Sequence, residues 1–571
     1  ISVDLYVDEN GKAEKAEDIK AMSYNIDDGY LQKDFLSPLD IFPEVLSKNV
    51  RRKTFAIPKA RVGSIIEYQY TIITPFLFML PDWEFQSDIP TIWSMYRVKM
   101  IPWYSYVYIG QGMEEYDHLE KYQEKYRTVS DGLGYGTHDL VSNIYELGMR
   151  NVPAFESEEF ITSKDDFLMK VDFQLAHVSH PSGGITDVIT TYPKMIQDLV
   201  KYDDYGKYIS KSERAAKDVI ESLSLDNLEE IEKIEAIVNA VKATTIYNGV
   251  PRLFSTKSPK DLLVDKRGNS AEINLFLVGA LRSAGFTADP VLLSTRDHGK
   301  INGEYPFLSY FNYSVVLVTW GGNRIIVDAT SDYLPFNRIP PECFNGSGLV
   351  VNNKENEVLW VDLNSVSQST ESISLNHSLN EDTGLLEGFC VMQSTGYEGF
   401  KRRRNFADKN EKIEEFYSKH FSQVDNIKTN NFDNPSLAYT VAAQGSSEVE
   451  RIADNFFLQP LSNFPMQENL LKATIRNYPV DMIYPYSHVF DSRITIPKGY
   501  VINDFPKPLS VDDELMTVRY KCYFENDVLL TLAEVDFKKA VYLPSEYSII
   551  REYINNMVTH FNAPVLVEKV K

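Results

Sequence analysis

The stretch Gly-Asn-Ser-Ala-Glu-Ile-Asn at residues 268–274 decides how the middle of this chain is interpreted. It is a glycine-led turn that runs into a strongly apolar segment, which predicts a helix starting at Ser270 and closed near Gly285. Downstream, Phe-Asn-Tyr at residues 311–313 opens a β-branched strand, and a second strand ends in Val-Asp-Ala-Thr at residues 327–330. Helices followed by an antiparallel sheet predict an α+β arrangement.

Three residues of this frame suggest an acyl-transfer site whose chemistry has changed. A thiol enzyme places its nucleophile at a helix N-terminus, moves the proton with an imidazole and orients that imidazole with a carboxylate. Here the helix start carries Ser270, the strand start carries Tyr313 and the strand end carries Asp328. Tyrosine, with a reference pKa near 10, is a poor base at neutral pH. Because loss of one key triad member removes on the order of 10⁴ to 10⁶ in rate, we expect little turnover.

Each of the three residues also has a structural interpretation. Ser270 suits the N-cap of a helix. Tyr313 suits a half-buried strand position, and Asp328 suits a hydrogen-bond acceptor at a strand end.

Three further polar residues are candidate binding residues. Asn269 and Asn312 directly precede Ser270 and Tyr313, and His298 follows the strand predicted at residues 290–294. His298 could act on a ligand or serve as an unrecognised base for Ser270, and a plain loop histidine is the alternative.

These motifs resemble the bacterial transglutaminase-like family, which is related to papain-type thiol enzymes. The family pattern Gly-Asp-Cys-x-Asp, then Asn-His, then Asp-x-Thr corresponds to residues 268–272, 312–313 and 328–330. The resemblance puts Ser270 at the position of the family's Cys, Tyr313 at that of its His and Asp328 at that of its Asp. It implies a transglutaminase-like α+β core at residues 190–355 with a degenerate triad.

The flanking segments resemble the β domains that precede and follow such cores in exported bacterial proteins. The resemblance is carried by Ile57-Pro58, residues 63–68, 83–86, 151–154, 463–465 and 496–500. With the strand-like alternation of both segments, it predicts a β-sandwich domain at residues 1–185 and a second β-sandwich domain at residues 365–571 with one inserted helix over residues 401–420. The predicted fold class is therefore a multidomain, β-rich α+β chain.

Charge and composition exclude some partners. The formal net charge of −23 opposes binding to nucleic-acid phosphates, and the one dense basic run, residues 401–404, is interpreted as the solvated face of a helix. No run approaches the ~18 apolar residues of a membrane-spanning helix, so no transmembrane segment is expected. Because the sequence starts at Ile1, we expect that a signal segment has been removed and that the protein is periplasmic or exported.

Cysteine and histidine spacing predicts no metal and no cofactor. Cys343, Cys390 and Cys522 form no disulfide framework. His177 and His180 lack a third ligand at metal-site spacing.

The sequence thus predicts a catalytically degenerate protein of the bacterial cell envelope that binds a peptide, a glycan or a partner protein without turnover. One alternative is an active hydrolase or acyl transferase that uses Ser270 with an unrecognised base. A second alternative is a purely structural interaction module.

Overall fold

The protein is built from two compact, β-rich units. The computed structural model describes residues 1–8, 11–47, 49–76, 80–100, 103–129, 137–180, 183–188, 191–352, 358–364, 368–407 and 409–570. Unit 1 comprises residues 1–85, 94–149 and 170–188, and unit 2 comprises residues 86–93, 150–169 and 189–571. Within the described residues, no helix has both the length and the apolar character that crossing a bilayer requires. The β-rich, multidomain class predicted from the sequence is confirmed.

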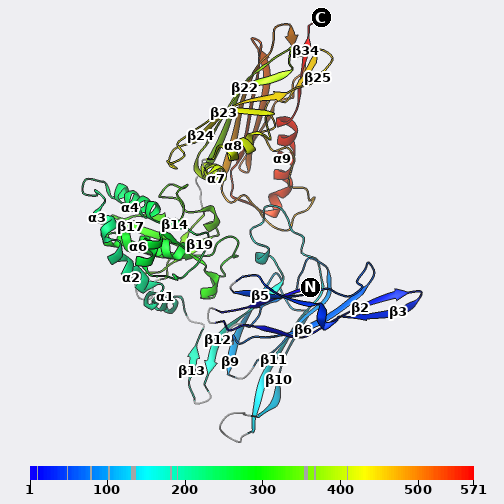
Figure 1. Ribbon diagram of the computed structural model, residues 1–571, viewed down its shortest axis with the longest axis vertical. Helices are drawn as coiled ribbons and strands as arrows, with labels where there is room; N and C mark the ends of the chain where they lie inside the picture. Colours follow the sequence, from blue (N-terminus) through cyan, green and yellow to red (C-terminus); the bar gives the residue numbers. More distant parts are fainter. Residues whose placement is uncertain are drawn as a thin grey trace. The chain divides into compact units, whose positions relative to one another are not determined.

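Unit 1 consists almost entirely of strands (Figure 1). They form the sheets β1-β5-β4, β3-β2-β6, β10-β11-β8 and β13-β12-β7, with β9 also paired to β12. The predicted sandwich packing of these sheets stays a prediction. The strands are β1 (Ser2–Tyr6), β2 (Lys15–Asp27), β3 (Tyr30–Phe35), β4 (Ile41–Val45), β5 (Val50–Phe55), β6 (Ile65–Ile73), β7 (Trp83–Glu84), β8 (Thr91–Met100), β9 (Tyr104–Gln111), β10 (His118–Val129), β11 (Thr137–Val152), β12 (Lys170–Ser179) and β13 (Ile185–Asp187).

Between residues 192 and 362, unit 2 packs helices onto a five-stranded antiparallel sheet of order β18-β17-β16-β19-β20. Helix α6 (Ser270–Ser283) begins where the sequence predicts, and its residues 270–281 are all buried. Gly279 permits α2 to approach closely, because a Cβ there would lie 2.5 Å from the Cβ of Ser212. The other elements are α1 (Tyr192–Lys201), α2 (Gly206–Ala215), α3 (Lys217–Glu221), α4 (Glu230–Thr244), α5 (Pro259–Asp265), β16 (Thr287–Leu293), β17 (Tyr313–Trp320), β18 (Asn323–Val327), β19 (Ser347–Val350) and β20 (Trp360–Asp362), with the short strands β14 (Ile246–Tyr247) and β15 (Arg267–Gly268).

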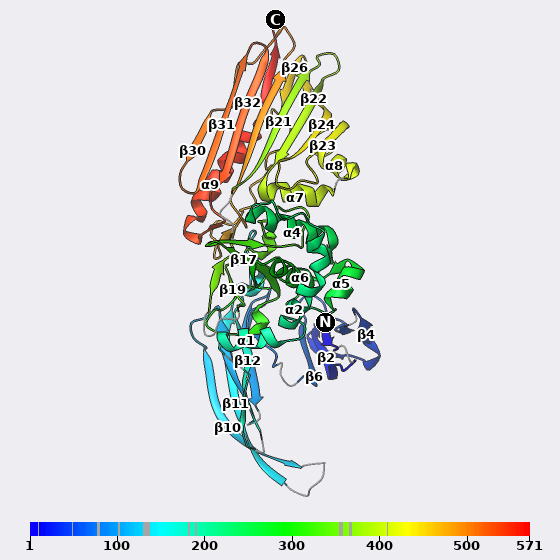
Figure 2. The same ribbon diagram turned by 90° about the vertical axis from the view of Figure 1, so that its left-hand side faces the viewer.

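The last part of unit 2 is organised around an eight-stranded sheet of order β23-β24-β22-β21-β28-β32-β31-β30. All of its neighbours are antiparallel except β21 and β28, which are parallel. Helix α9 (Tyr547–Phe561) lies across one face of the sheet (Figure 2) and buries Ile550, Ile554 and Phe561 in the same hydrophobic core. The strands are β21 (Ser369–Leu379), β22 (Leu385–Ser394), β23 (Gln423–Asn430), β24 (Tyr439–Glu448), β28 (Tyr486–Thr495), β30 (Leu509–Asp512), β31 (Met516–Glu525) and β32 (Val528–Phe537).

The prediction of one inserted helix over residues 401–420 is wrong, because two helices occupy this part of the chain. Helix α7 (Gly396–Phe406) ends at Ala407, which adopts a left-handed conformation with φ 47°. Helix α8 (Asn410–Tyr417) then starts after Lys409. The left-handed residue redirects the chain, which the helical spacing of the apolar residues does not reveal.

The basic run at residues 401–404 is a solvated face only in part: Lys401 and Arg404 are exposed, whereas Arg402 and Arg403 bind groups inside the domain. Arg402 forms a bidentate ion pair with the buried Glu371, with both N···O distances 2.6 Å. Arg403 is only 1% exposed, and its guanidinium donates to backbone carbonyls of the segment 431–437. Arg402 and Arg403 therefore hold α7 to the rest of the domain, and the exposed Lys401 and Arg404 pair with Glu398 and Glu342.

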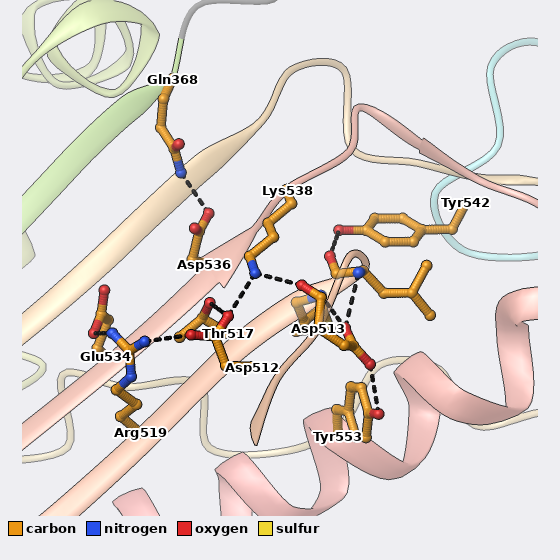
Figure 3. Close-up of polar contacts among 12 residues, drawn as sticks. Gln368, Asp512, Asp513, Thr517, Arg519, Glu534, Asp536, Lys538, Tyr542 and Tyr553 are labelled. Atoms are coloured by element: carbon orange, nitrogen blue, oxygen red, sulfur yellow. Dashed lines mark hydrogen bonds and ion pairs between the residues drawn. The ribbon is translucent and has the colours of Figure 1, made fainter. Parts of the chain in front are cut away.

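A polar network fixes α9 and the edge of the eight-stranded sheet (Figure 3). Lys538 donates to Asp512 and to the backbone carbonyl of Asp513. The Asp513 carboxylate accepts from Tyr553 of α9 at 2.7 Å, so the loop that joins β30 to β31 is bound to the helix. On the sheet itself, Arg519 pairs with both Asp512 and Glu534.

Candidate functional site

The start of α6 is held by a capping box. The Asn269 side chain accepts from the backbone N–H of Glu272, and the Glu272 carboxylate accepts from the N–H of Asn269, both at 2.9 Å. The second Glu272 oxygen accepts from the N–H and hydroxyl of Thr256. Gly268 is required in front of this box, because a Cβ there would lie 2.6 Å from Leu262 and 2.9 Å from Glu272.

Ser270 is the first residue of the helix and not its N-cap, because Asn269 occupies the cap. The Ser270 side chain is completely buried. Its hydroxyl donates to the backbone carbonyl of Arg252 at 3.0 Å and accepts from the N–H of Arg252 at 2.9 Å. The hydroxyl proton is therefore already used in a structural hydrogen bond.

Asp328 lies just past the end of β18 and accepts four hydrogen bonds. One carboxylate oxygen accepts from Tyr313 at 2.9 Å and from the Asn274 amide at 2.6 Å. The other accepts from both the N–H and the hydroxyl of Thr330. Asn274, one turn after Ser270 on α6, also donates to the Ser314 carbonyl and accepts from the N–H of Ala329. This carboxylate thus joins α6 to the ends of two strands.

Tyr313 is more buried than its half-buried prediction, with 3% of its surface exposed. Its hydroxyl lies 2.9 Å from both an Asp328 oxygen and the Thr330 hydroxyl. Burial and the neighbouring Asp328 charge raise the pKa of Tyr313 well above its ordinary value. The phenol therefore stays protonated at neutral pH and acts as a donor, which excludes it as a general base there.

Lys242, near the end of α4, is a buried cation that the sequence reasoning missed. It is 6% exposed and donates to the Leu334 carbonyl at 2.7 Å. Burial lowers the pKa of Lys242 to about 8, although the charges of Asp328 and Asp332 act in the opposite direction. A lysine inside a helical apolar pattern gives no signal that distinguishes it from a solvated one.

A cavity of about 450 Å³ lies beside Tyr313. Its aromatic walls are Tyr247, Tyr313, Tyr333 and Phe400, and its polar groups come from Thr295, Asp297, Thr330, Ser331, Glu342 and Arg404. Gly249 and Pro251 line it as well, so the segment that clamps Ser270 through Arg252 also borders the cavity.

Cys343 lines the same cavity, although its sequence context gave no reason to place it there. The thiol is fully buried, and burial raises its pKa well above the ordinary value. Because a thiol reacts as the thiolate, the raised pKa disfavours Cys343 as a nucleophile at neutral pH.

The three predicted binding residues lie around the site in supporting positions. Asn269 caps α6, and Asn312 pairs with the backbone N–H and hydroxyl of Thr295, which lines the cavity. His298 is exposed, and its ring nitrogen Nδ1 lies 3.0 Å from the Ser294 hydroxyl. Tyr313 is brought to the cavity wall, whereas Ser270 faces the Arg252 backbone.

Among the residues that the structure describes, two groups of side chains have geometries that could hold a metal ion. His118, Glu120 and Glu146 lie together in unit 1, and Glu371, Glu398 and His488 lie together in unit 2. Both Glu371 oxygens already bind Arg402, and Glu146 pairs with Arg97, so a cation would compete with a guanidinium in each group. His177 and His180 pair separately, with Asp187 and Thr186.

Comparison with known proteins places the chain by its fold. Residues 454–567 match the family DUF3858, a domain of unknown function with a solved structure. No curated protein matches the chain. A crystal structure from Parabacteroides distasonis ATCC 8503, described as a "putative protease", has a TM-score of 0.57 and 12% identity, and the match covers 99% of this chain and 91% of that one. The chain therefore shares its fold with that protein.

A second structural match is partial. It is a "putative cysteine protease" from Cytophaga hutchinsonii, with a TM-score of 0.18, 14% identity, and coverage of 44% of this chain and 74% of that one.

Proposed function

We propose that this protein is a catalytically inactive relative of transglutaminase-like enzymes that binds an extended peptide or glycan in the cavity beside Tyr313. One observation carries the proposal. The hydrogen-bonding groups of Ser270 and Asp328 are taken up inside the protein, while a cavity of about 450 Å³ remains beside Tyr313 and Thr330, which bind Asp328. A hydrolase needs a nucleophile with a base in hydrogen-bond reach, and Ser270 instead binds the backbone of Arg252.

The cavity has the chemistry of a binding site. Ligand pockets of roughly 300–1,000 Å³ combine apolar, aromatic walls with a few polar groups that fix orientation. Tyr333 and Phe400 contribute aromatic carbon to the wall, against which a sugar ring or an apolar side chain could pack. Thr330, Asp297 and Arg404 supply acceptors and donors at its edge.

The proposal includes a location in the bacterial cell envelope, where peptide and glycan ligands coexist. Fractionation of the native host, followed by immunodetection of the chain in the envelope fractions, tests this part. Recovery in the cytoplasm alone would contradict it.

Turnover is tested with labelled casein as a hydrolysis substrate and with monodansylcadaverine incorporation into casein. We expect no activity in the wild type and none in Ser270→Ala. Wild-type activity that Ser270→Ala abolishes would make Ser270 a nucleophile and overturn the proposal. Activity in a Ser270→Cys plus Tyr313→His variant beside a silent wild type would support it, because the cavity would then hold substrate productively and only the chemistry would be missing.

Binding is tested with soluble peptidoglycan fragments, which contain both peptide and glycan. We expect Tyr333→Ala, which removes an aromatic wall, to weaken binding at least tenfold. Tyr30→Ala, which removes an exposed ring on β3, is the matched control and is expected to have no effect. If the wild type binds neither these fragments nor casein peptides, the structural-module alternative is favoured.

A further inference from the structure

Strand β6 (Ile65–Ile73) combines properties that buried or protected strands do not have. It pairs only with β2 among the described strands, so its other edge has no β neighbour. All nine of its residues are exposed, and its six large apolar side chains are between 41% and 69% exposed. Natural edge strands are protected by Lys, Pro or bulges. Residues 65–73 contain neither Lys nor Pro, and the bulge in the β2–β6 ladder has its extra residue on β2, between Glu17 and Lys20.

The sequence of β6 is nearly a palindrome. It reads Ile-Ile-Glu-Tyr-Gln-Tyr-Thr-Ile-Ile, with Gln69 at the centre. When two such strands run antiparallel about a two-fold axis at Gln69, Ile65 faces Ile73 and Ile66 faces Ile72. Tyr68 then faces Tyr70, and these two rings already stack along the strand with centroids 6.5 Å apart.

We propose that β6 is the dimerisation edge of this protein and that its occupant is the β6 strand of a second copy, paired antiparallel about Gln69. A two-fold interface requires a self-complementary surface, and a palindromic edge strand supplies one. Aromatic and β-branched residues opposite one another are the pairs that stabilise antiparallel strands. The one charged residue, Glu67, lies opposite Thr71, so no like charges meet.

The register follows from the same pattern. Shifting one strand by a single residue would turn every side chain to the opposite face of the joined sheet. A shift by two would place Ile65 opposite Thr71 and break the match of like with like. A parallel arrangement would place Glu67 opposite its own copy. The two-fold antiparallel register is therefore favoured over its neighbours. This inference is independent of the cavity and of the proposed function.

Disulfide trapping tests the register directly. The three native cysteines are buried, so a new surface cysteine is the reactive thiol. Under mild oxidation Gln69→Cys is expected to cross-link into dimers, because residue 69 lies opposite its own copy. Glu67→Cys is expected not to cross-link, because in this register the two copies of residue 67 are about four residues, or roughly 14 Å, apart along the strand. Gln32→Cys, on the opposite edge strand β3, is a second control.

Association without cross-linking is measured by light scattering coupled to gel filtration. We expect the 65.4 kDa chain to approach twice that mass as its concentration rises to about 100 μM, the range of a small edge-to-edge interface. A double variant, Ile66→Lys plus Ile72→Lys, should weaken association at least tenfold. In the dimer alone, its ammonium groups would lie opposite each other. Leu31→Lys on β3 is the control and should not weaken association. The proposal is overturned if Gln69→Cys cross-links no faster than Gln32→Cys. It is also overturned if Glu67→Cys cross-links as well as Gln69→Cys, because that result would indicate edge association without a fixed register.

Discussion

Removing one oxygen atom from Tyr313 tests whether this side chain serves as a structural anchor for Asp328. In Tyr313→Phe the ring stays in place, and Asp328 loses one of its four hydrogen-bond donors. A hydrogen bond to a charged group contributes about 1.5–3 kcal/mol. Three donors from Asn274 and Thr330 remain, so we expect a loss of about 2 kcal/mol, in the lower half of that range.

Hydrogen exchange of peptides from β17 and α6 measures this loss locally, which a transition of the whole multidomain chain would not. A loss of about 2 kcal/mol corresponds to roughly 30-fold faster exchange of the protected amides, since every 1.4 kcal/mol is tenfold. Tyr333→Phe is the matched control. It removes the same oxygen from another tyrosine of the cavity wall, and that hydroxyl has no hydrogen-bond partner among the described residues. We expect its exchange to change less than threefold.

Unchanged protection in Tyr313→Phe would refute the reasoning, because the hydroxyl would then contribute nothing to holding Asp328. Equal losses in Tyr313→Phe and Tyr333→Phe would also refute it, since the effect would come from the cavity wall in general. Full protection together with loss of a catalytic activity would return Tyr313 to a functional role.

Three other predictions concern buried charges. Burial lowers the pKa of Lys242 to about 8 from roughly 10.4 in the unfolded chain, so the unfolded state binds more protons between those values. Stability therefore rises with pH in this window, and the wild type should gain about 2 kcal/mol over Lys242→Met as pH rises from 8 to 10, measured by urea unfolding. Burial alone would raise the pKa of Glu398, but the hydrogen bond from His488 and nearby positive charges lower it to about 2. The stability that this carboxylate provides is therefore present above about pH 4.5 and is lost as pH falls toward 2. Acid unfolding of Glu398→Gln should depend less on pH than that of the wild type, and identical profiles would contradict this. Arg403→Lys should lower the free energy of unfolding by about 2–4 kcal/mol, because an ammonium cannot reach all the carbonyls that the guanidinium binds. Arg404 is exposed, so Arg404→Lys should change the free energy of unfolding by less than about 1 kcal/mol.

Local sequence was sufficient to predict the elements that frame the site. Gly268 and Asn269 mark the start of α6, and the apolar run after them predicts its burial. The β-branched run after Tyr313 predicts β17, and the second strand predicted to end at residues 327–330 is β18. These features depend on residues close together in the chain, where turn and capping preferences act.

The partners of the site residues could not be predicted, because they come from distant segments. Ser270 binds the backbone of Arg252, 18 positions earlier, and backbone groups carry no sequence signal. Lys242 and Arg403 look like solvated cations, since their burial depends on carbonyls of Leu334 and of the segment 431–437. A charged residue whose partner is a main-chain carbonyl is invisible to pattern analysis, whichever helix it occupies.

Asp328 is weak support for catalysis, because the hydrogen bonds that its carboxylate accepts inside the protein are enough to explain its presence. In a thiol triad the acid orients an imidazole, and it needs a free lone pair to do so. Here its oxygens accept from Tyr313, Asn274 and Thr330, and the same Asn274 joins α6 to the chain after β18 through Ala329. Replacing Asp328 by Asn would turn an amide N–H₂ toward existing donors and leave them unpaired. An acid held by four donors is therefore explained by folding alone, and any activity at this site has to be argued from Ser270, whose hydroxyl binds the backbone of Arg252.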